Sequence, residues 1–226
     1  MKIIGHRGAA GIAVENSKEG INKALQLGVS YIEIDVWKTI DNEVVVFHDI
    51  NLLRLTSKNQ LITNLRFDDL CKLKLSNGET IPTLKEIIQL IKDKNIKLLV
   101  EVKDESAFEE TLNILNHELS NESYIIGSFF HKQIYELKKE YPQLKTAIMF
   151  EGVLLNIDKY LNIINPEYIV TSIETFNSEI CEIIKNQDRK LVFYTINNQT
   201  QLELALKVKP YAIITDYPNV FINIDN

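Results

Sequence analysis

The chain has 226 residues, of which 45% are hydrophobic and 25% are charged, and this composition excludes a largely disordered protein. Its 31 acidic and 25 basic residues give a net charge of −6, which argues against bulk binding to nucleic acid or to an anionic membrane. The N-terminus shows no signal-peptide pattern, and no apolar run approaches the ~18 residues of a membrane-spanning helix, so we expect a cytoplasmic protein without an integral membrane segment.

The first fifty residues begin an alternation of short apolar runs with segments of helical periodicity. They predict strands at 2–5, 31–37 and 44–47 and a helix at 16–27. The strand at 44–47 follows the turn pair Asp41-Asn42, and we interpret it as a hairpin return on the strand before it. This return is expected to open a small insertion at 49–81.

The insertion is less regular than the rest of the chain and leads into a well-marked helix. Within it, only a short helix at 67–73 is predicted. Thr83 is then the predicted N-cap of a helix that runs to residue 92, because Glu86 stands three residues further on and completes a capping box.

From residue 98 onward, predicted strands and helices alternate regularly. Strands are predicted at 98–102, 124–127, 145–150, 168–170, 191–195 and 212–215, and helices at 107–119, 131–140, 154–164, 177–186 and 200–208. Apart from the hairpin return, this gives eight strands with helical crossovers, which predicts an α/β protein closed into a (β/α)₈ TIM barrel. The alternative is an open doubly wound sheet. Since no internal repeat or linker interrupts the pattern, residues 1–226 are expected to form one domain.

Three acidic residues occupy strand positions where apolar residues are usual. Glu33 and Asp35 share one face of a strand whose other face is apolar, and Glu101 and Lys103 share a face at the end of another strand. On a solvent-facing sheet or strand end, these would be ordinary charged side chains. Inside a barrel, the carboxylates would repel one another and lose hydration, and a bound cation removes both costs. Three carboxylates without His or Cys suit one hard divalent cation, Mg²⁺ or Ca²⁺.

Two histidines end predicted strands at the same rim as the carboxylates. His6 follows the first strand and His48 follows the hairpin return, and histidine suits proton transfer to and from oxygen near neutral pH. Arg7 and Lys103 stand beside these groups, and a guanidinium with an ammonium holds a phosphate well. Since active sites of such barrels lie at the C-terminal ends of the strands, we expect these residues to form one site.

Four further residues that could carry chemistry stand in less suggestive surroundings. His117 and His131 lie in polar helical contexts, where we expect surface side chains. Cys71 and Cys181 lie in apolar, helix-like stretches without Cys or His neighbours, so we expect two buried free thiols in a reducing compartment.

A series of motifs along nearly the whole chain resembles the glycerophosphodiester phosphodiesterase family. The motifs, in chain order, are His6-Arg7-Gly8, Glu15-Asn16, Glu33-x-Asp35-Val36, Thr39-x-Asp41, Val45-Val46-x-His48-Asp49, Ile81-Pro82-Thr83-Leu84, Glu101-x-Lys103, Ser128-Phe129 and Thr215-Asp216-Tyr217-Pro218. The resemblance implies a barrel with a small insertion after the second strand. It also implies metal-dependent hydrolysis of glycerophosphodiesters to glycerol 3-phosphate and an alcohol, a role in lipid and glycerol metabolism, and a small-molecule substrate.

The same resemblance implies a role for each matching residue. His6 and His48 look like the acid–base pair, Glu33, Asp35 and Glu101 like the metal ligands, Arg7 and Lys103 like phosphate contacts, and Glu15 and Asn16 like groups that support the site or touch the glycerol. The family usually carries a tryptophan where Tyr194 stands. Tyr194 and Phe129 are therefore candidate substrate-binding residues, with simple core packing as the alternative.

Two other functions stay open at the level of sequence. A lysophospholipase D-type activity on lysophospholipids would keep the fold and need an apolar groove near the mouth, and the 49–81 insertion holds several leucines between polar residues. A non-catalytic barrel that binds a phosphodiester is the alternative from another class, although no catalytic candidate is missing. The sequence leaves open which cation is preferred, which histidine is the base, and whether the protein is a monomer or a dimer.

Overall fold

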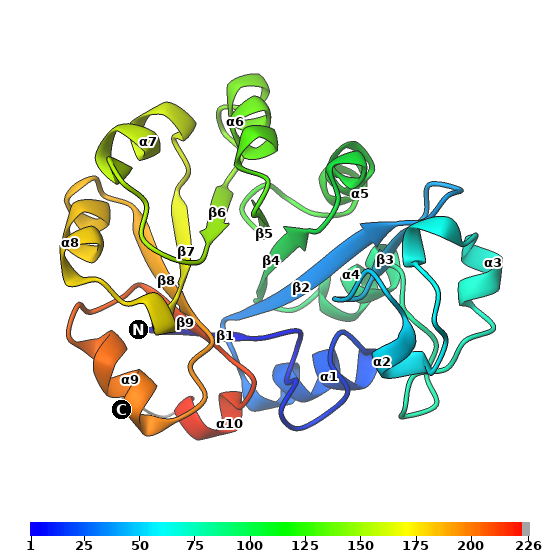
Figure 1. Ribbon diagram of the computed structural model, residues 1–226. Coiled ribbons are helices and arrows are strands. Elements are labelled where there is room, and N and C mark those ends of the chain that lie inside the picture. The colour runs from blue at the N-terminus through cyan, green and yellow to red at the C-terminus, as the bar shows by residue number, and fades with distance from the viewer. Residues whose placement is uncertain (223–226) are drawn as a thin grey trace.

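Eight parallel strands close into a barrel in the computed structural model, which describes residues 1–222 (Figure 1). The order around the ring is β1-β9-β8-β7-β6-β5-β4-β2, and pairing of β1 with β2 closes it. The strands are β1 (Lys2–Gly5), β2 (Tyr31–Lys38), β4 (Lys97–Val102), β5 (Tyr124–Ser128), β6 (Thr146–Phe150), β7 (Tyr168–Ser172), β8 (Lys190–Tyr194) and β9 (Ala212–Thr215). The predicted barrel is confirmed, and closure excludes the open sheet. The last four residues of the predicted domain lie outside the described part.

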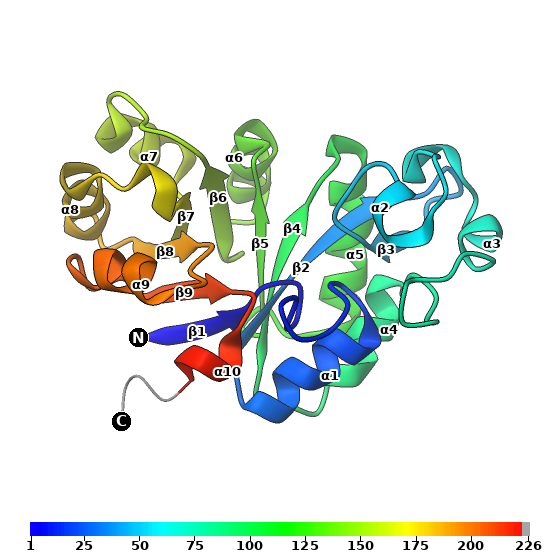
Figure 2. The ribbon, with the colours of Figure 1, turned by 60° about the horizontal axis from the view of Figure 1, so that its bottom comes forward.

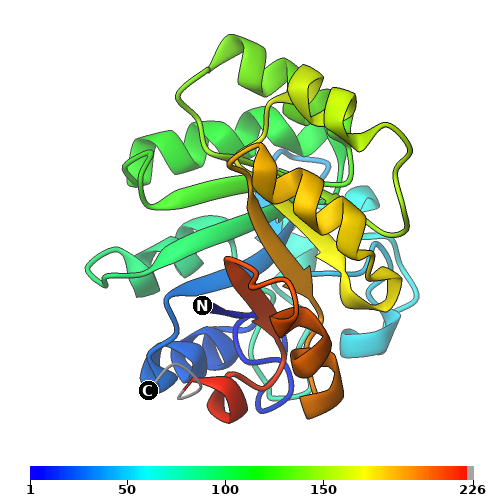
Figure 3. The ribbon, with the colours of Figure 1, turned by 90° about the vertical axis from the view of Figure 1, so that its left-hand side faces the viewer.

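Helices cover the outside of the barrel, and Figure 3 shows α6, α7 and α8 side by side there. The helices are α1 (Lys18–Leu27), α4 (Leu84–Ile91), α5 (Phe108–Glu118), α6 (His131–Glu140), α7 (Ile157–Ile164), α8 (Ser178–Asn186), α9 (Gln199–Leu206) and α10 (Pro218–Phe221). None of the helices in residues 1–222 is long and apolar enough to cross a membrane.

Local signals set most helix boundaries as the sequence predicts. Thr83 caps α4, and its capping box with Glu86 is present. The helix predicted from residue 154 begins only at Ile157, because Gly152 and Asn156 take left-handed φ angles of 92° and 53° that end the preceding loop.

The alternation of residues along β2 decides which side chains enter the barrel. Ile32 and Ile34 belong to the outer apolar layer between strands and helices. Glu33 and Asp35 therefore point to the inside, where an apolar layer that includes Leu99 closes the end of the barrel away from the site. The C-terminal strand ends surround the other, open end.

Residues 49–81 project from this open end, next to the end of β2 (Figure 2). They follow β3 (Val44–Val46), which pairs antiparallel with β2 as the predicted hairpin return. The segment holds only short helices, namely α2 (Leu53–Thr56), η1 (Ile62–Asn64) and α3 (Phe67–Leu70). Its buried side chains form a small apolar cluster with Trp37 and Phe47, which fixes it to the barrel.

Two expectations about individual residues are wrong. Cys71 is exposed, because α3 ends at Leu70, which is buried, and the next residue turns away from the barrel. Cys181 is buried as expected. His131 is not a surface residue: its Nδ1 lies 2.7 Å from the Tyr160 hydroxyl and its Nε2 lies 2.8 Å from the carbonyl of Met149.

Candidate active site

The turn after β1 places His6 and Arg7 at the open end of the barrel. Arg7 takes a left-handed φ of 49°, and its backbone N–H donates to Glu33 Oε2 at 2.9 Å. Gly8 follows with a φ of 90°, and a Cβ there would lie 2.6 Å from the backbone of Gly20. The third residue of His6-Arg7-Gly8 must therefore be glycine for this loop to pack against α1.

Each of the two predicted catalytic histidines is paired with an aspartate. His6 Nδ1 lies 2.6 Å from Asp216 Oδ1, and His48 Nδ1 lies 2.7 Å from Asp49 Oδ1. Since a carboxylate can only accept, both Nδ1 atoms carry the proton, and each Nε2 is left to accept or deliver another. Asp216 is itself held at Oδ2 by the side-chain amide of Asn197, at 2.6 Å.

The partners of these aspartates keep them charged. Burial raises the pKa of Asp216, but the hydrogen bond and charge of His6, the hydrogen bond from Asn197 and the charge of Arg7 together outweigh this and lower that pKa. Burial also raises the pKa of Asp49, but hydrogen bonds from Arg54 and His48 lower it. At neutral pH, both histidines therefore face a full negative charge on the Nδ1 side.

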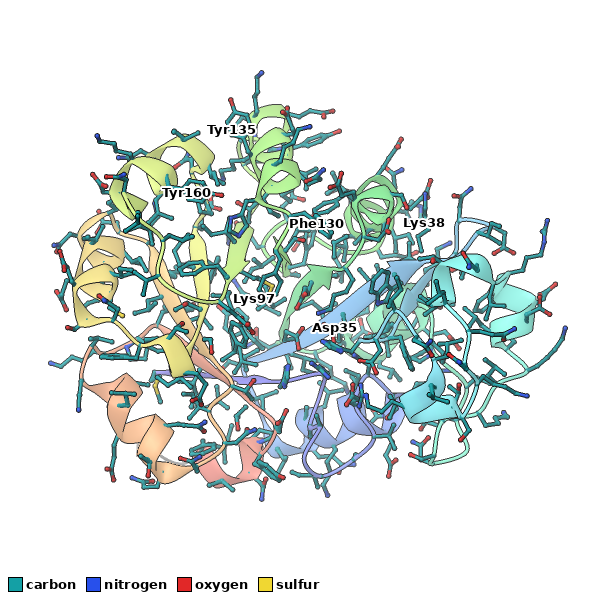
Figure 4. The ribbon with its side chains drawn as sticks, in the orientation of Figure 1. Asp35, Lys38, Lys97, Phe130, Tyr135 and Tyr160 are labelled. Atoms are coloured by element: carbon teal, nitrogen blue, oxygen red, sulfur yellow. The ribbon has the colours of Figure 1, made fainter. Side chains whose placement is uncertain are left out.

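Glu33, Asp35 and Glu101 are buried together at the centre of the site, and Figure 4 labels Asp35 on β2 inside the ring of strands. One oxygen from each of the three lies within 4.8 Å of the others. Burial and the charges of its two neighbours raise the pKa of Glu33 well above its ordinary value, and burial with the charge of Asp35 raises the pKa of Glu101 to about 7. Burial also opposes ionisation of Asp35, but Lys103 and Arg7 outweigh it and hold its pKa at about 2.

Two cations lie against these carboxylates but do not neutralise them. Lys103 Nζ lies 3.0 Å from Asp35 Oδ1 and 2.5 Å from Glu101 Oε1, and Arg7 Nε lies 3.3 Å from Asp35 Oδ2. Arg7 Nε is buried, and no group in residues 1–222 forms a hydrogen bond with it. If all three carboxylates are ionised, they exceed the two cations by one negative charge, which agrees with the raised pKa values of Glu33 and Glu101. A buried, all-oxygen donor set of this kind fits a hard divalent cation.

Glu15 and Asn16 support this group from the loop between β1 and α1. The side-chain amide of Asn16 donates to Asp35 Oδ2 at 2.8 Å, and Arg7 donates to Glu15 Oε1 at 2.8 Å. Arg54, from α2, donates to both oxygens of Glu15 at 2.6 and 2.7 Å and to Asp49 Oδ2 at 2.6 Å. One arginine outside the barrel thus connects the Arg7 and His48 sides of the site.

The residues enclose a small cavity of about 170 Å³, which we call the chamber. Its lining comprises His6, Arg7, Glu33, His48, Glu101, Lys103, Phe129, Met149, Glu151, Tyr194, Thr195 and Ile214. Phe129 and Tyr194 meet edge to face across it, with ring centroids 6.4 Å apart. The Tyr194 hydroxyl lies 3.3 Å from Glu151 Oε1, so the chamber wall also offers polar groups.

The structure brings together all the residues predicted for the site, with Glu15 and Asn16 just behind its wall. Sequence reasoning assigned no role to Asp49, Arg54, Asn197 or Asp216. Asp49 and Asp216 each directly follow a predicted site residue or strand end, and that position and their place in the two motifs are the signals available for them. Arg54 lies in the irregular 49–81 segment, where no periodicity marks it.

Comparisons with known proteins agree on one family. The profile of the Glycerophosphoryl diester phosphodiesterase family matches residues 6–220. A glycerophosphodiester phosphodiesterase of Caldanaerobacter subterraneus is 27% identical over 98% of this chain and 96% of that protein, and one of Bacillus altitudinis is 25% identical over 96% of this chain and 95% of that protein. A solved phosphodiesterase of Oleispira antarctica, in complex with the product sn-glycerol-3-phosphate, is 25% identical and has a TM-score of 0.93, covering 100% of this chain and 97% of its own.

Proposed function

The chain belongs to the glycerophosphoryl diester phosphodiesterase family, and from this premise we propose that it hydrolyses glycerophosphodiesters to glycerol 3-phosphate and an alcohol with the help of one divalent cation. The observation that carries the proposal is the convergence on one chamber of two His–Asp pairs, three buried carboxylates and two cations. The product bound to the solved relative from Oleispira antarctica supports glycerol 3-phosphate as the product here.

The cation would be held by Glu33, Asp35 and Glu101, as Mg²⁺ or Ca²⁺, and when bound it supplies a Lewis acid that withdraws charge from the phosphoryl group. Arg7 and Lys103 lie beside these ligands, and within the described part of the chain Arg7 Nε has no hydrogen-bond partner. These two side chains are placed to stabilise the charge that builds on the phosphoryl oxygens.

The two histidines divide the proton transfers between them. One Nε2 takes the proton of the nucleophile, which is water or the 2-hydroxyl of the glycerol, and the other Nε2 gives a proton to the leaving alkoxide. Attack by the 2-hydroxyl forms a cyclic phosphate, which water then opens to glycerol 3-phosphate. Asp49 and Asp216 hold both rings in the tautomer that leaves Nε2 free for these steps.

The proposal also covers the domain organisation of the chain and its cellular location. Residues 1–226 act as one barrel domain that carries 49–81 as a small insertion, because the short helices of this segment pack through one apolar cluster against Trp37 and Phe47 of the barrel. The reaction is a step of lipid and glycerol metabolism, which we place in the cytoplasm.

Release of glycerol 3-phosphate from glycerophosphocholine tests the function directly. We expect turnover with Mg²⁺ or Ca²⁺ and none after treatment with EDTA. His6→Ala and His48→Ala should each lower kcat by ~10²–10⁴, which is the usual worth of one proton transfer. His117→Ala is the matched control, because that side chain is 84% exposed and does not line the chamber.

Each part of the proposal has its own contrary result. Activity that persists in EDTA would contradict the role of the cation, and full activity in either histidine variant would contradict the role of the acid–base pair. Tight binding of glycerophosphocholine in a calorimeter, with no turnover in any cation, would instead identify a non-catalytic binding protein.

A further inference from the structure

A second and larger cavity of about 820 Å³ lies beside the chamber at the open end of the barrel. We call it the vestibule. One wall comes from residues 49–81, with Ile50 and Leu53, and the opposite wall comes from the loop after β5, with Phe129 and Phe130. Phe130 lies on the side of the barrel between α5 and α6 (Figure 4).

The apolar walls of the vestibule are open to solvent. Ile50 is 46% exposed, Leu53 53%, Phe129 44% and Phe130 36%, although these four residues face a common space. Scattered apolar residues on a surface need no explanation, but a group of large ones around a cavity marks a place for an apolar ligand. Each of these side chains could otherwise be polar without disturbing the barrel, because none belongs to its core clusters.

The vestibule is continuous with the chamber. His48, Lys103 and Phe129 line both cavities, whereas His6, Arg7 and Tyr194 line only the chamber. One substrate can therefore extend from the chamber into the vestibule, with its phosphate close to the border between the two.

The chamber is the part that suits phosphate and glycerol. It is small, Arg7 lines it, and Lys103 lies at its border with the vestibule, while Tyr194 inside it and Glu151 at the same border offer a hydroxyl and a carboxylate to the hydroxyls of glycerol. The inner apolar layer closes the barrel beyond it, so the group on the far side of phosphorus must leave towards the vestibule. The vestibule exceeds the chamber almost fivefold in volume, which is far more space than a choline or ethanolamine needs.

We propose that the vestibule binds an apolar chain on the leaving alcohol, so that the preferred substrates are glycerophosphodiesters whose alcohol carries an alkyl or acyl chain. This proposal rests on the proposed function, since it concerns the substrate class of the same site. It differs from a lysophospholipase D-type activity, in which the chain is attached to the glycerol and would have to fit the small chamber.

A series of substrates that differ only in chain length tests the proposal. We would measure kcat/KM for the ethyl, butyl and octyl esters of glycerol 3-phosphate, together with glycerophosphocholine and octanoyl lysophosphocholine, all below their micelle-forming concentrations. A fully buried methylene is worth at most about fourfold in kcat/KM. In an open vestibule we expect a smaller gain for each methylene, and at least a tenfold rise from the ethyl to the octyl ester.

Variants show whether the vestibule causes the rise. Leu53→Ser and Ile50→Ser should flatten the dependence on chain length, because each removes exposed apolar surface from one wall. Leu155→Ser is the matched control, since Leu155 is 88% exposed in the loop after β6 but does not line the vestibule. The readout is a ratio between substrates within one variant, so a general loss of activity does not change it.

The outcomes separate this inference from the function on which it rests. Equal values across the alkyl series, or a preference for glycerophosphocholine over the octyl ester, overturn the inference and leave the proposed function intact. A preference for octanoyl lysophosphocholine over the octyl ester places the chain on the glycerol instead and also overturns it. If no compound is hydrolysed, the proposed function itself fails.

Discussion

Asp216 does not line the chamber, but its hydrogen bond with His6 positions the imidazole ring, and this role can be measured. Its Oδ1 accepts the Nδ1 proton of His6 at 2.6 Å, and Asn197 holds its other oxygen. In Asp216→Asn, the amide can present an N–H to the ring and favour the other tautomer. We expect kcat to fall at least ~10-fold, towards the ~10²–10⁴ that one proton transfer is worth, with KM nearly unchanged.

The comparison of kcat with KM separates positioning from a general loss of structure. Asp216→Glu keeps the acceptor and should recover part of kcat, whereas Asp93→Asn, an exposed aspartate in the loop before β4, should leave both constants unchanged. An Asp216→Asn enzyme with normal kcat and a lower melting temperature would reduce Asp216 to a structural residue.

The sequence predicts single residues of the site better than their partners. Glu33 and Asp35 are predictable because strand periodicity places them on one face, and the structure confirms their burial inside the barrel. Asp216 and His6 are 210 positions apart, and only the pairing of β1 with β9 brings them together. Local pattern carries no information about such a contact, so the sequence marks the aspartate only as part of a motif.

At the scale of elements, α2 is a four-residue helix whose Arg54 links two parts of the site. Arg54 binds Glu15, the partner of Arg7, and Asp49, the partner of His48. Lysine can keep the charge but cannot make three directed hydrogen bonds to two carboxylates. We expect Arg54→Lys to lower kcat/KM by about tenfold and Arg54→Gln to lower it further.

The pH profile of these variants shows how Arg54 acts. Burial raises the pKa of Asp49, and the hydrogen bond from Arg54 is the first of the contacts that lower it. Without Arg54, that pKa rises, Asp49 takes up its proton at higher pH, and activity on the acid side should fail at higher pH than in the unmodified enzyme. Arg66→Lys, an exposed arginine of the same 49–81 segment, is the control. If the acid limb of the pH–activity profile is not shifted in Arg54→Gln, this result would contradict the link between Arg54 and Asp49.

A histidine of α6 contacts α7, and the local sequence pattern predicts its exposure wrongly. The helix around His131 is polar, which favours a surface position, but its partner Tyr160 comes from the next helix. Since the Met149 carbonyl can only accept, His131 Nε2 carries the proton and Nδ1 accepts from the Tyr160 hydroxyl. A residue's exposure therefore depends on the neighbouring element as well as on its own.

This contact makes stability depend on pH in a stated direction. Burial lowers the pKa of His131 in the folded protein, so as the pH falls the unfolded chain takes up this proton first. The contribution is present above the unfolded pKa of ~6.5 and is lost as the pH falls below it. Urea denaturation between pH 8 and pH 5 should show a smaller loss of stability in His131→Gln than in the unmodified protein. Equal losses would show that His131 does not report on folding.

On the scale of the whole molecule, an acidic chain can bind an anionic substrate because its positive side chains are placed where that substrate binds. The net charge is −6, yet Arg7 and Lys103 are both at the chamber, where the strands from both ends of the chain meet.

The alternation of strands and helices is sufficient to predict the barrel, since both periodicities are visible in the sequence. The vestibule was not predictable as a cavity, because it lies between residues 49–81 and the loop after β5, and their relative placement comes only from packing.

The barrel buries three acidic side chains together at its centre, and this predicts how the stability of the protein responds to metal. Three buried carboxylates face only two cations, so without metal their joint ionisation is unfavourable, and the pKa of Glu33 is raised. A cation that binds only the folded state at a hundred times its Kd adds ~2.7 kcal/mol of stability. For a chain of this length, that corresponds to a rise in Tm of roughly 5–10 °C when Mg²⁺ or Ca²⁺ is added to chelator-treated protein.

Neutralising one of the carboxylates separates the charge effect from other effects of the ion. Glu33→Gln removes the carboxyl whose ionisation is opposed by burial and by its acidic neighbours, so without metal its Tm should equal or exceed that of the unmodified protein, while added cation should raise it little and activity should be lost. Glu19→Gln, on the outer helix α1, is the control and should respond to metal like the unmodified protein. A metal-induced rise that is as large in Glu33→Gln as in the unmodified protein would mean that the ion binds elsewhere, and the three buried acids would then need another explanation.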